Sequence, residues 1–97
     1  MLTSKQRAQL RSLANGEDTI VQIGKSGITD SVVAQAAEAL KARELIKCRV
    51  LDNSLLSARE ACGELCRLCL AEPVQVIGTR FVIYKMNRDK PGIKLVK

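Results

Sequence analysis

The 97-residue chain contains no histidine and no tryptophan, and its aromatic residues are limited to Phe81 and Tyr84. Histidine is the side chain that most often transfers protons in catalysis near neutral pH, so its absence removes most general acid–base chemistry. No apolar run approaches the ~20 residues that a membrane-spanning helix needs, and no secretory leader precedes the first helical pattern. We therefore expect a cytoplasmic protein that is not an enzyme, has no cofactor and contacts no membrane.

Charge is the most informative feature of the composition. A chain of this length supports one hydrophobic core, and its net charge is +6. Five cations and one acid lie in the stretch from Lys85 to Lys97. We expect a single domain over residues 1–86 and a basic tail over residues 87–97 that has no fixed position when free. A basic surface favours a polyanionic partner, although on charge alone a surface that only confers solubility is an equal alternative.

Local signals predict an α-β-α-β-α-β-β order. Thr3 and Gln6 form a capping box, which predicts a helix to about Ala14 that buries Leu10, Leu13 and Ala14. Residues 19–23 are β-branched and nearly all apolar, as in a strand covered on both faces. The further predicted elements are helices at about 29–43 and 54–70 and strands at 45–51, 74–77 and 80–86.

Strand–helix–strand units imply parallel pairing, and a closing hairpin at Gly78-Thr79 adds an antiparallel strand. We therefore predict a two-layer α/β fold with a mixed four-stranded sheet. Residues 45–51 alternate strictly, with Ile46 and Cys48 on one face and Lys47 and Arg49 on the other. This alternation predicts a sheet face that is open and basic.

Three of the four cysteines follow the spacing C-x3-C-x2-C, as Cys62, Cys66 and Cys69. On a helix they fall in the middle of one apolar stripe that also contains Leu65 and Leu55, where a free thiol behaves as a small hydrophobe. Cys62 and Cys69 would be roughly 10.5 Å apart along the helix axis. Two thiolates on one zinc ion are at most about 4.6 Å apart. The stretch therefore favours a helix face packed in the core, with a metal or redox site as the minor alternative.

The segment Gly24-Lys25-Ser26-Gly27 joins a predicted strand to a predicted helix N-terminus. Glycines let backbone amides approach a ligand, the helix N-terminus favours anions, and Lys25 adds a mobile positive charge. The pattern is not a Walker loop or a dinucleotide fingerprint, but G-x-x-G loops clamp nucleic-acid backbones in KH domains. Taken alone it is more often an ordinary turn; beside the basic clusters it favours phosphate binding.

Three motifs in order resemble the CRM (chloroplast RNA splicing and ribosome maturation) domain family, whose stand-alone bacterial form is the YhbY-type ribosome-assembly protein. They are residues 22–29 (QIGKSGIT), 44–47 (ELIK) and 74–78 (VQVIG), and the resemblance spans nearly the whole chain. It implies a fold similar to the C-terminal domain of translation initiation factor three, preceded by an extra helix. The cysteine-rich stretch is not part of the resemblance.

The resemblance also implies binding of structured RNA and association with precursors of the large ribosomal subunit. The family's RNA-contacting loop maps onto Gly24 to Gly27, and its basic lysine maps onto Lys47. With the basic surface added, the predicted RNA-binding residues are Gly24, Lys25, Ser26, Gly27, Lys47, Arg49, Lys5, Arg80 and Lys85. We expect the protein to act as a monomer.

Two alternative functions remain open at this point. One is a cysteine-based metal or redox protein that uses the C-x3-C-x2-C stretch. The other is a protein-interaction module on the ribosome, with its basic tail docked on an acidic partner. The scarcity of aromatic residues favours recognition of RNA shape and phosphates over stacking of unpaired bases.

Overall fold

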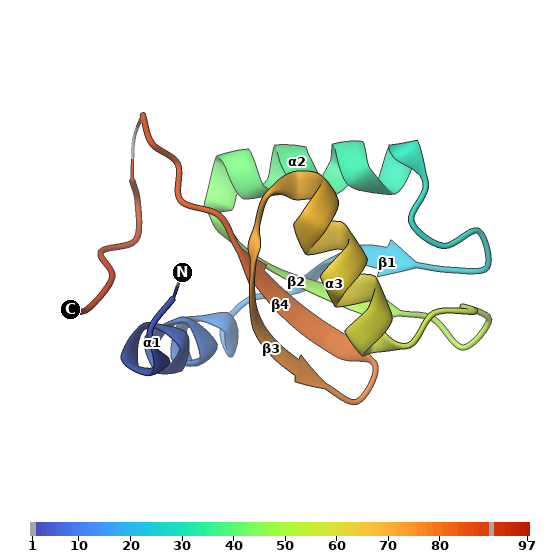
Figure 1. Ribbon diagram of the computed structural model, residues 1–97, viewed down its shortest axis with the longest axis horizontal. Coiled ribbons are helices and arrows are strands. Elements are labelled where there is room, and N and C mark those ends of the chain that lie inside the picture. Colours follow the sequence, from blue (N-terminus) through green and yellow to red (C-terminus); the bar gives the residue numbers. More distant parts are fainter. Residues whose placement is uncertain (1, 90) are drawn as a thin grey trace.

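The computed structural model describes residues 2–89 and 91–97, and its elements follow the predicted order (Figure 1). These elements are α1 (Ser4–Ala14), β1 (Thr19–Ile23), α2 (Asp30–Arg43), β2 (Leu45–Val50), α3 (Ala58–Cys69), β3 (Glu72–Ile77) and β4 (Arg80–Tyr84). The four strands form one sheet in the order β1-β2-β4-β3. β1 and β2 are parallel and the other pairs are antiparallel, so the predicted mixed sheet is confirmed.

Side-chain caps set the helix starts. The predicted box at Thr3 and Gln6 is present on α1, and the Thr29 hydroxyl accepts from the Val32 amide on α2. α3 has a second capping box, in which Ser57 and Glu60 exchange hydrogen bonds. That box starts α3 at Ala58 and leaves residues 51–57 as a loop, so the expected start near residue 54 is wrong. Leu55, expected in the buried stripe, is instead 87% exposed.

α2 and α3 pack together on one face of the sheet and enclose the larger core (Figure 1). The prediction that the cysteine stretch faces this core is confirmed, because Cys62, Cys66 and Cys69 are all buried there with Cys48 of β2. A hydrogen bond from the Cys66 thiol lowers the pKa of Cys62 and raises that of Cys66. Within residues 2–89 and 91–97, no three His, Cys, Asp or Glu side chains are grouped to hold a metal ion.

α1 lies on the opposite face of the sheet and adds a partial third layer to the predicted two. Its Leu10 and Ala14 join a second core with Leu45, Val82 and Tyr84. The face expected to be open is therefore covered over the half where β2 begins. Because α1 is short, the half that carries Lys47 and Arg49 stays uncovered.

Two burial predictions are wrong. Leu13, expected in the core, is 46% exposed, and only Leu10 and Ala14 of α1 join the core on that face. β1, expected to be covered on both faces, exposes Gln22. β1 is an edge strand, and α1 contacts β2 and β3 instead.

The chain after β4 forms no helix or strand in its described part, but it has a fixed position against α1. The expectation that this tail is disordered when free is therefore wrong. Gln6 and Gln9 of α1 hydrogen-bond the backbone of Lys94 and Val96, with N–O distances of 2.6 to 2.9 Å. Ile93 and Leu95 pack against the second core.

A single carboxylate anchors the start of this tail. Glu44, between α2 and β2, is 4% exposed and has a φ of 65°. Its Oε1 accepts from the amides of Gly92 and Ile93 at 2.6 and 2.9 Å, and its Oε2 accepts from the Asn87 amide at 2.7 Å. Hydrogen bonds to an ionised acceptor are the strong kind, so Glu44 holds the tail to the body of the protein.

In the described part of the chain, no helix is long and apolar enough to cross a membrane.

Alkaline pH should destabilise the protein through Cys48. Burial, with smaller contributions from Cys62 and Cys69, raises the pKa of the Cys48 thiol from 9.0 to about 12. Between these values the unfolded chain loses a proton that the folded chain keeps, so the free energy of unfolding falls by up to about 1.4 kcal/mol per pH unit for one group. Denaturant titrations above pH 9.0 measure the slope. Cys48→Ala should flatten it, and an unchanged slope would contradict the assignment.

Releasing the Glu44 carboxylate should free the tail without unfolding the domain. Glu44→Ala leaves three backbone amides without their acceptor, and we expect a local loss of about 3 kcal/mol. Hydrogen exchange at the amides of Asn87, Gly92 and Ile93 should then be roughly a hundredfold faster. Glu38→Ala, which removes an exposed carboxylate from the preceding helix α2, is the control and should leave exchange at these amides unchanged. Equal protection in both variants would rule out the anchoring role.

Candidate nucleic-acid interface

Three connecting segments meet at the end of the sheet where β1 and β2 terminate. They are residues 24–29, residues 51–57 and the Gly78-Thr79 turn. The Leu51 amide donates to the Ile23 carbonyl, and the Val50 amide donates to the Thr79 carbonyl, each at 2.8 Å. These bonds hold the segments to one another. Figure 1 shows this end of the molecule opposite α1 and the two chain termini.

The GKSG segment forms a tight turn, as predicted. The Gly27 amide donates to the Gly24 carbonyl at 3.0 Å, which places Lys25 and Ser26 exposed at the tip. Gly27 has a φ of 72°, a conformation that residues with a Cβ rarely adopt. Gly24 has no such constraint. A Cβ there would meet the Asn53 side chain at 3.5 Å, an ordinary contact, so the fold does not require glycine at position 24.

The N-terminus of α2 contributes less to anion binding than the sequence suggests. The Thr29 hydroxyl already accepts from the Val32 amide, at 3.2 Å, which satisfies one amide of the first turn. Asp30 is exposed in that same turn and places a negative charge beside the helix end. Positive charge at the loop therefore depends mainly on Lys25.

The uncovered half of the sheet continues the basic surface from the loop. Arg49 of β2 pairs in register with Arg80 of β4, and Gln22 of β1 lies on the other side of Arg49. Lys47 lies two residues before Arg49 on β2 and therefore on the same face of the sheet. Like charges directly opposite on neighbouring strands destabilise a sheet. Within residues 2–89 and 91–97, no carboxylate forms an ion pair with these three cations or with Lys25.

A groove of about 380 Å³ runs along this half of the sheet. Its walls are the end of α1, at Ala14 and Asn15, and the β3–β4 turn. Lys47 and Arg80 are among the residues that line it. Acidic residues also lie at this end, namely Asp30 in the first turn of α2 and Asp52 in the loop 51–57.

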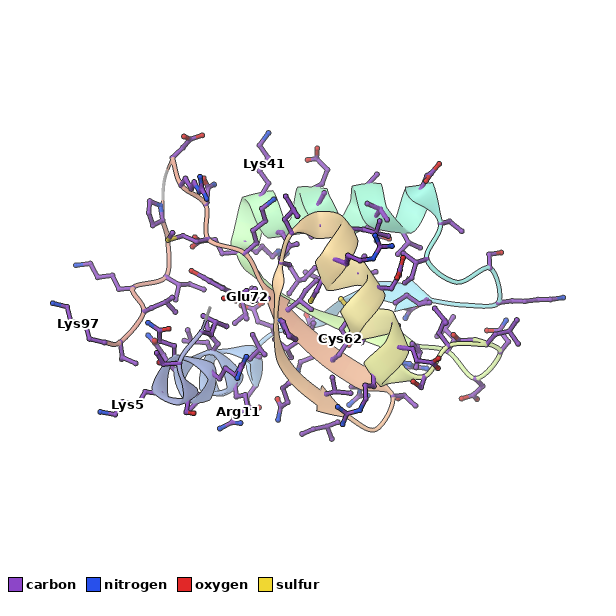
Figure 2. All side chains as sticks on the ribbon, viewed as in Figure 1. Lys5, Arg11, Lys41, Cys62, Glu72 and Lys97 are labelled. Carbon is purple, nitrogen blue, oxygen red and sulfur yellow. The ribbon has the colours of Figure 1, made fainter. Side chains whose placement is uncertain are left out.

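The structure brings together most, but not all, of the predicted RNA-binding residues. Gly24, Lys25, Ser26, Gly27, Lys47, Arg49 and Arg80 lie at the end of the sheet just described. Lys85 does not, because its amide donates to the Glu44 carbonyl next to the start of β2, roughly 17 Å from the strand's other end. Lys5 lies on α1 at the far end of the molecule (Figure 2).

Several side chains on the same surface were not selected from the sequence. They are Gln22, Asn53, Leu55, Ile77 and Thr79, all exposed. The Ser57–Glu60 capping box was the missed signal for Asn53 and Leu55, because it assigns residues 51–57 to a loop. Gln22 had no sequence signal, since its exposure depends on how far α1 extends over the sheet.

Comparisons with known proteins agree with the motifs. The model of the CRS1/YhbY (CRM) domain matches residues 2–85. The probable RNA-binding protein YqeI of Bacillus subtilis is 41% identical over 95 residues, covering 98% of this chain and 99% of that protein. An RNA-binding protein of Haemophilus influenzae is 31% identical over 88 residues, covering 91% and 89%.

A solved structure shows the same fold. The solution structure of the Staphylococcus aureus protein SAV1595 has a TM-score of 0.82 and 43% identity, and the match covers 99% of this chain and 100% of that one. The family match, the relatives of nearly equal length and the shared fold all cover the segments that form the surface described above. The chain belongs to the CRS1/YhbY (CRM) domain family.

Proposed function

We propose that this protein binds structured RNA through the GKSG turn and the uncovered half of the sheet, without catalysing a reaction. One observation carries the proposal: Lys25, Lys47, Arg49 and Arg80 gather at one end of the sheet without a carboxylate partner in the described part of the chain. The Arg49–Arg80 pair costs folding stability, and a polyanion on this face relieves that repulsion. Relatives named as RNA-binding proteins support the choice of polyanion.

The chemistry of the surface favours phosphate and shape recognition. Flexible cations and loop amides suit phosphate oxygens, which position an RNA without reading its bases. Aromatic rings for stacking are scarce, and both Phe81 and Tyr84 are buried. A double-stranded or tightly folded RNA, which presents a wide minor groove lined by phosphates and 2′-hydroxyls, fits such a surface better than an unpaired strand.

The cellular target we propose is the precursor of the large ribosomal subunit, bound in the cytoplasm by a single copy of the protein. In this proposal residues 1–86 form the RNA-binding domain, and residues 87–97 form a basic tail attached to it. Crosslinking in cells followed by sequencing of the bound RNA tests the target. Large-subunit ribosomal RNA is the expected product, whereas messenger or small-subunit RNA would overturn the ribosomal part and leave RNA binding intact.

Removing the charge of Lys25 should weaken RNA binding whatever the RNA sequence. Each lost phosphate contact lowers the steepness of the salt dependence by about one unit of log Kd against log salt. Fluorescence anisotropy with two hairpins of unrelated sequence, across a salt series, measures both effects. Arg67→Gln removes one charge from the outer face of α3 and is the control. If Lys25→Ala and Arg67→Gln bind as tightly as the unmodified protein, the loop does not contact RNA.

Alanine substitutions of the two glycines in the turn should distinguish an effect on folding from an effect on RNA binding. Gly27→Ala forces a positive φ on a residue with a Cβ and should cost about 1 kcal/mol of stability. Gly24→Ala meets only ordinary contacts and should leave thermal unfolding unchanged. If RNA backbone approaches the turn closely, Gly24→Ala weakens binding in a fully folded protein. Undiminished affinity of Gly24→Ala would show that RNA does not approach this part of the turn.

A further inference from the structure

A second basic surface lies at the other end of the molecule from the GKSG turn. It is formed by α1 and the tail residues 91–97, and we call it the α1–tail surface. Its cations are Lys5, Arg7, Arg11, Lys94 and Lys97, and neither segment contains an aspartate or glutamate. These five charges nearly equal the net charge of the whole chain, +6. The net positive charge is therefore concentrated on this surface.

The structure holds these cations in place instead of leaving them on a loose tail. The Gln9 side-chain amide donates to the Lys94 carbonyl and accepts from the Val96 amide. Glu44 fixes the start of the tail, and Ile93 and Leu95 pack against the second core. All of the cations are exposed except Arg7, which is half-buried and donates to the Pro73 carbonyl at 3.4 Å. A surface ordered before binding loses less conformational entropy when it binds.

The α1–tail surface is too far from the GKSG turn to act as part of one small site. The longest extent of the protein is 39 Å, and the turn and α1 lie toward opposite ends of it (Figure 1). Figure 2 shows Lys5, Arg11 and Lys97 at the α1 end. Electrostatic interactions between exposed charges are screened beyond about 8 Å at physiological salt. The GKSG turn and the far part of the α1–tail surface, at Lys5 and Lys97, therefore attract polyanions independently, whereas Arg11 lies one helical turn from the groove wall at Ala14.

The outward face of α1 has the character of a surface that contacts phosphates. Ser4, Ala8 and Ser12 are exposed with Lys5 and Arg11. Leu13 and Val96 are the large apolar side chains exposed on the two segments, at 46% and 43%, so the five cations outnumber them. Interfaces with protein partners rely on aromatic or aliphatic residues packed at their centre. Exposed cations with no acidic neighbours on their own segments suit a phosphate backbone instead.

We propose that the α1–tail surface binds a second RNA segment, so that one protein molecule holds two separate RNA segments at once. The inference rests on the proposed function, which supplies the first RNA at the GKSG end. Two helices of a folding RNA held by one protein are at high effective concentration with respect to each other, which favours their association. The protein then acts as a tether between RNA segments as well as a ligand of one of them.

A bridging assay tests the proposal on the full-length protein. One RNA hairpin is immobilised, a second hairpin carries a fluorophore, and retention of the fluorophore is measured as protein is added. Bridging predicts retention that rises and then falls at excess protein, when each RNA becomes saturated separately. Sedimentation should give one protein and two RNA molecules per complex. A complex of two proteins and two RNA molecules would attribute bridging to dimers and overturn the proposal.

Charge-neutralising variants separate the two surfaces. Lys5→Gln, Arg11→Gln and Lys97→Gln combined should reduce retention roughly tenfold while binding of the first RNA persists. The control combines Arg59→Gln and Arg67→Gln, exposed cations of α3, and should retain bridging. Glu44→Ala, which keeps every cation but frees the tail, should bridge less well than the unmodified protein.

The possible failures are distinguishable. If the unmodified protein binds one hairpin with a 1:1 limit and never retains the second, the tether is wrong and the proposed function stands. If it binds no RNA at all, the proposed function itself fails. If the Lys5, Arg11 and Lys97 variant bridges normally but no longer binds a poly-glutamate peptide, the surface serves an acidic protein partner and the tether is again overturned.

Discussion

The alternation of side chains along β2 is the constraint on which the rest of the structure depends. β2 is hydrogen-bonded on both sides, to β1 and β4, so its two faces lie against different neighbours. Ile46, Cys48 and Val50 enter the core under α2 and α3, whereas Leu45 enters the core under α1. Lys47 and Arg49 share a face with Leu45 but are half-buried, because α1 ends at Ala14 beside the groove that Lys47 lines. One strand of six residues thus carries parts of both cores and of the basic surface.

Glu44 has a comparable role for the tail. Its carboxylate lies immediately before β2 and accepts three amides from residues after β4. Burying a carboxylate costs free energy unless it is hydrogen-bonded. The burial of Glu44 therefore depends on the tail amides, and the position of the tail depends on Glu44. The motif Glu44-Leu45-Ile46-Lys47 therefore contains a tail anchor, a residue of each core and a cation of the open face. Its four residues have four different structural roles.

The cysteine-rich helix shows what residue spacing alone predicts correctly and what it does not. The helical wheel correctly placed Cys62, Cys66 and Cys69 on a buried face, because burial of a helix stripe follows directly from its periodicity. The same wheel failed for Leu55, because it assumed that the helix extended that far. The capping box of Ser57 and Glu60 starts the helix at Ala58, so Leu55 lies outside it. Loop 51–57 then joins the GKSG turn at one end of the sheet.

The sequence by itself determined the order of the elements, the caps of α1 and α2, the mixed sheet and the GKSG turn. These features depend on local hydrogen bonds and on short-range periodicity, which are visible in neighbouring residues. Only the tertiary structure decided how much of the second sheet face α1 covers, and hence why Gln22 is exposed, and it decided that Leu13 of α1 is 46% exposed. It also decided that Lys5 and Lys85 lie away from the turn and that the tail is anchored by Glu44. The tail anchor depends on hydrogen bonds between residues 43 to 49 positions apart, and the coverage by α1 depends on its contacts with β2 and β3. No local pattern specifies either arrangement.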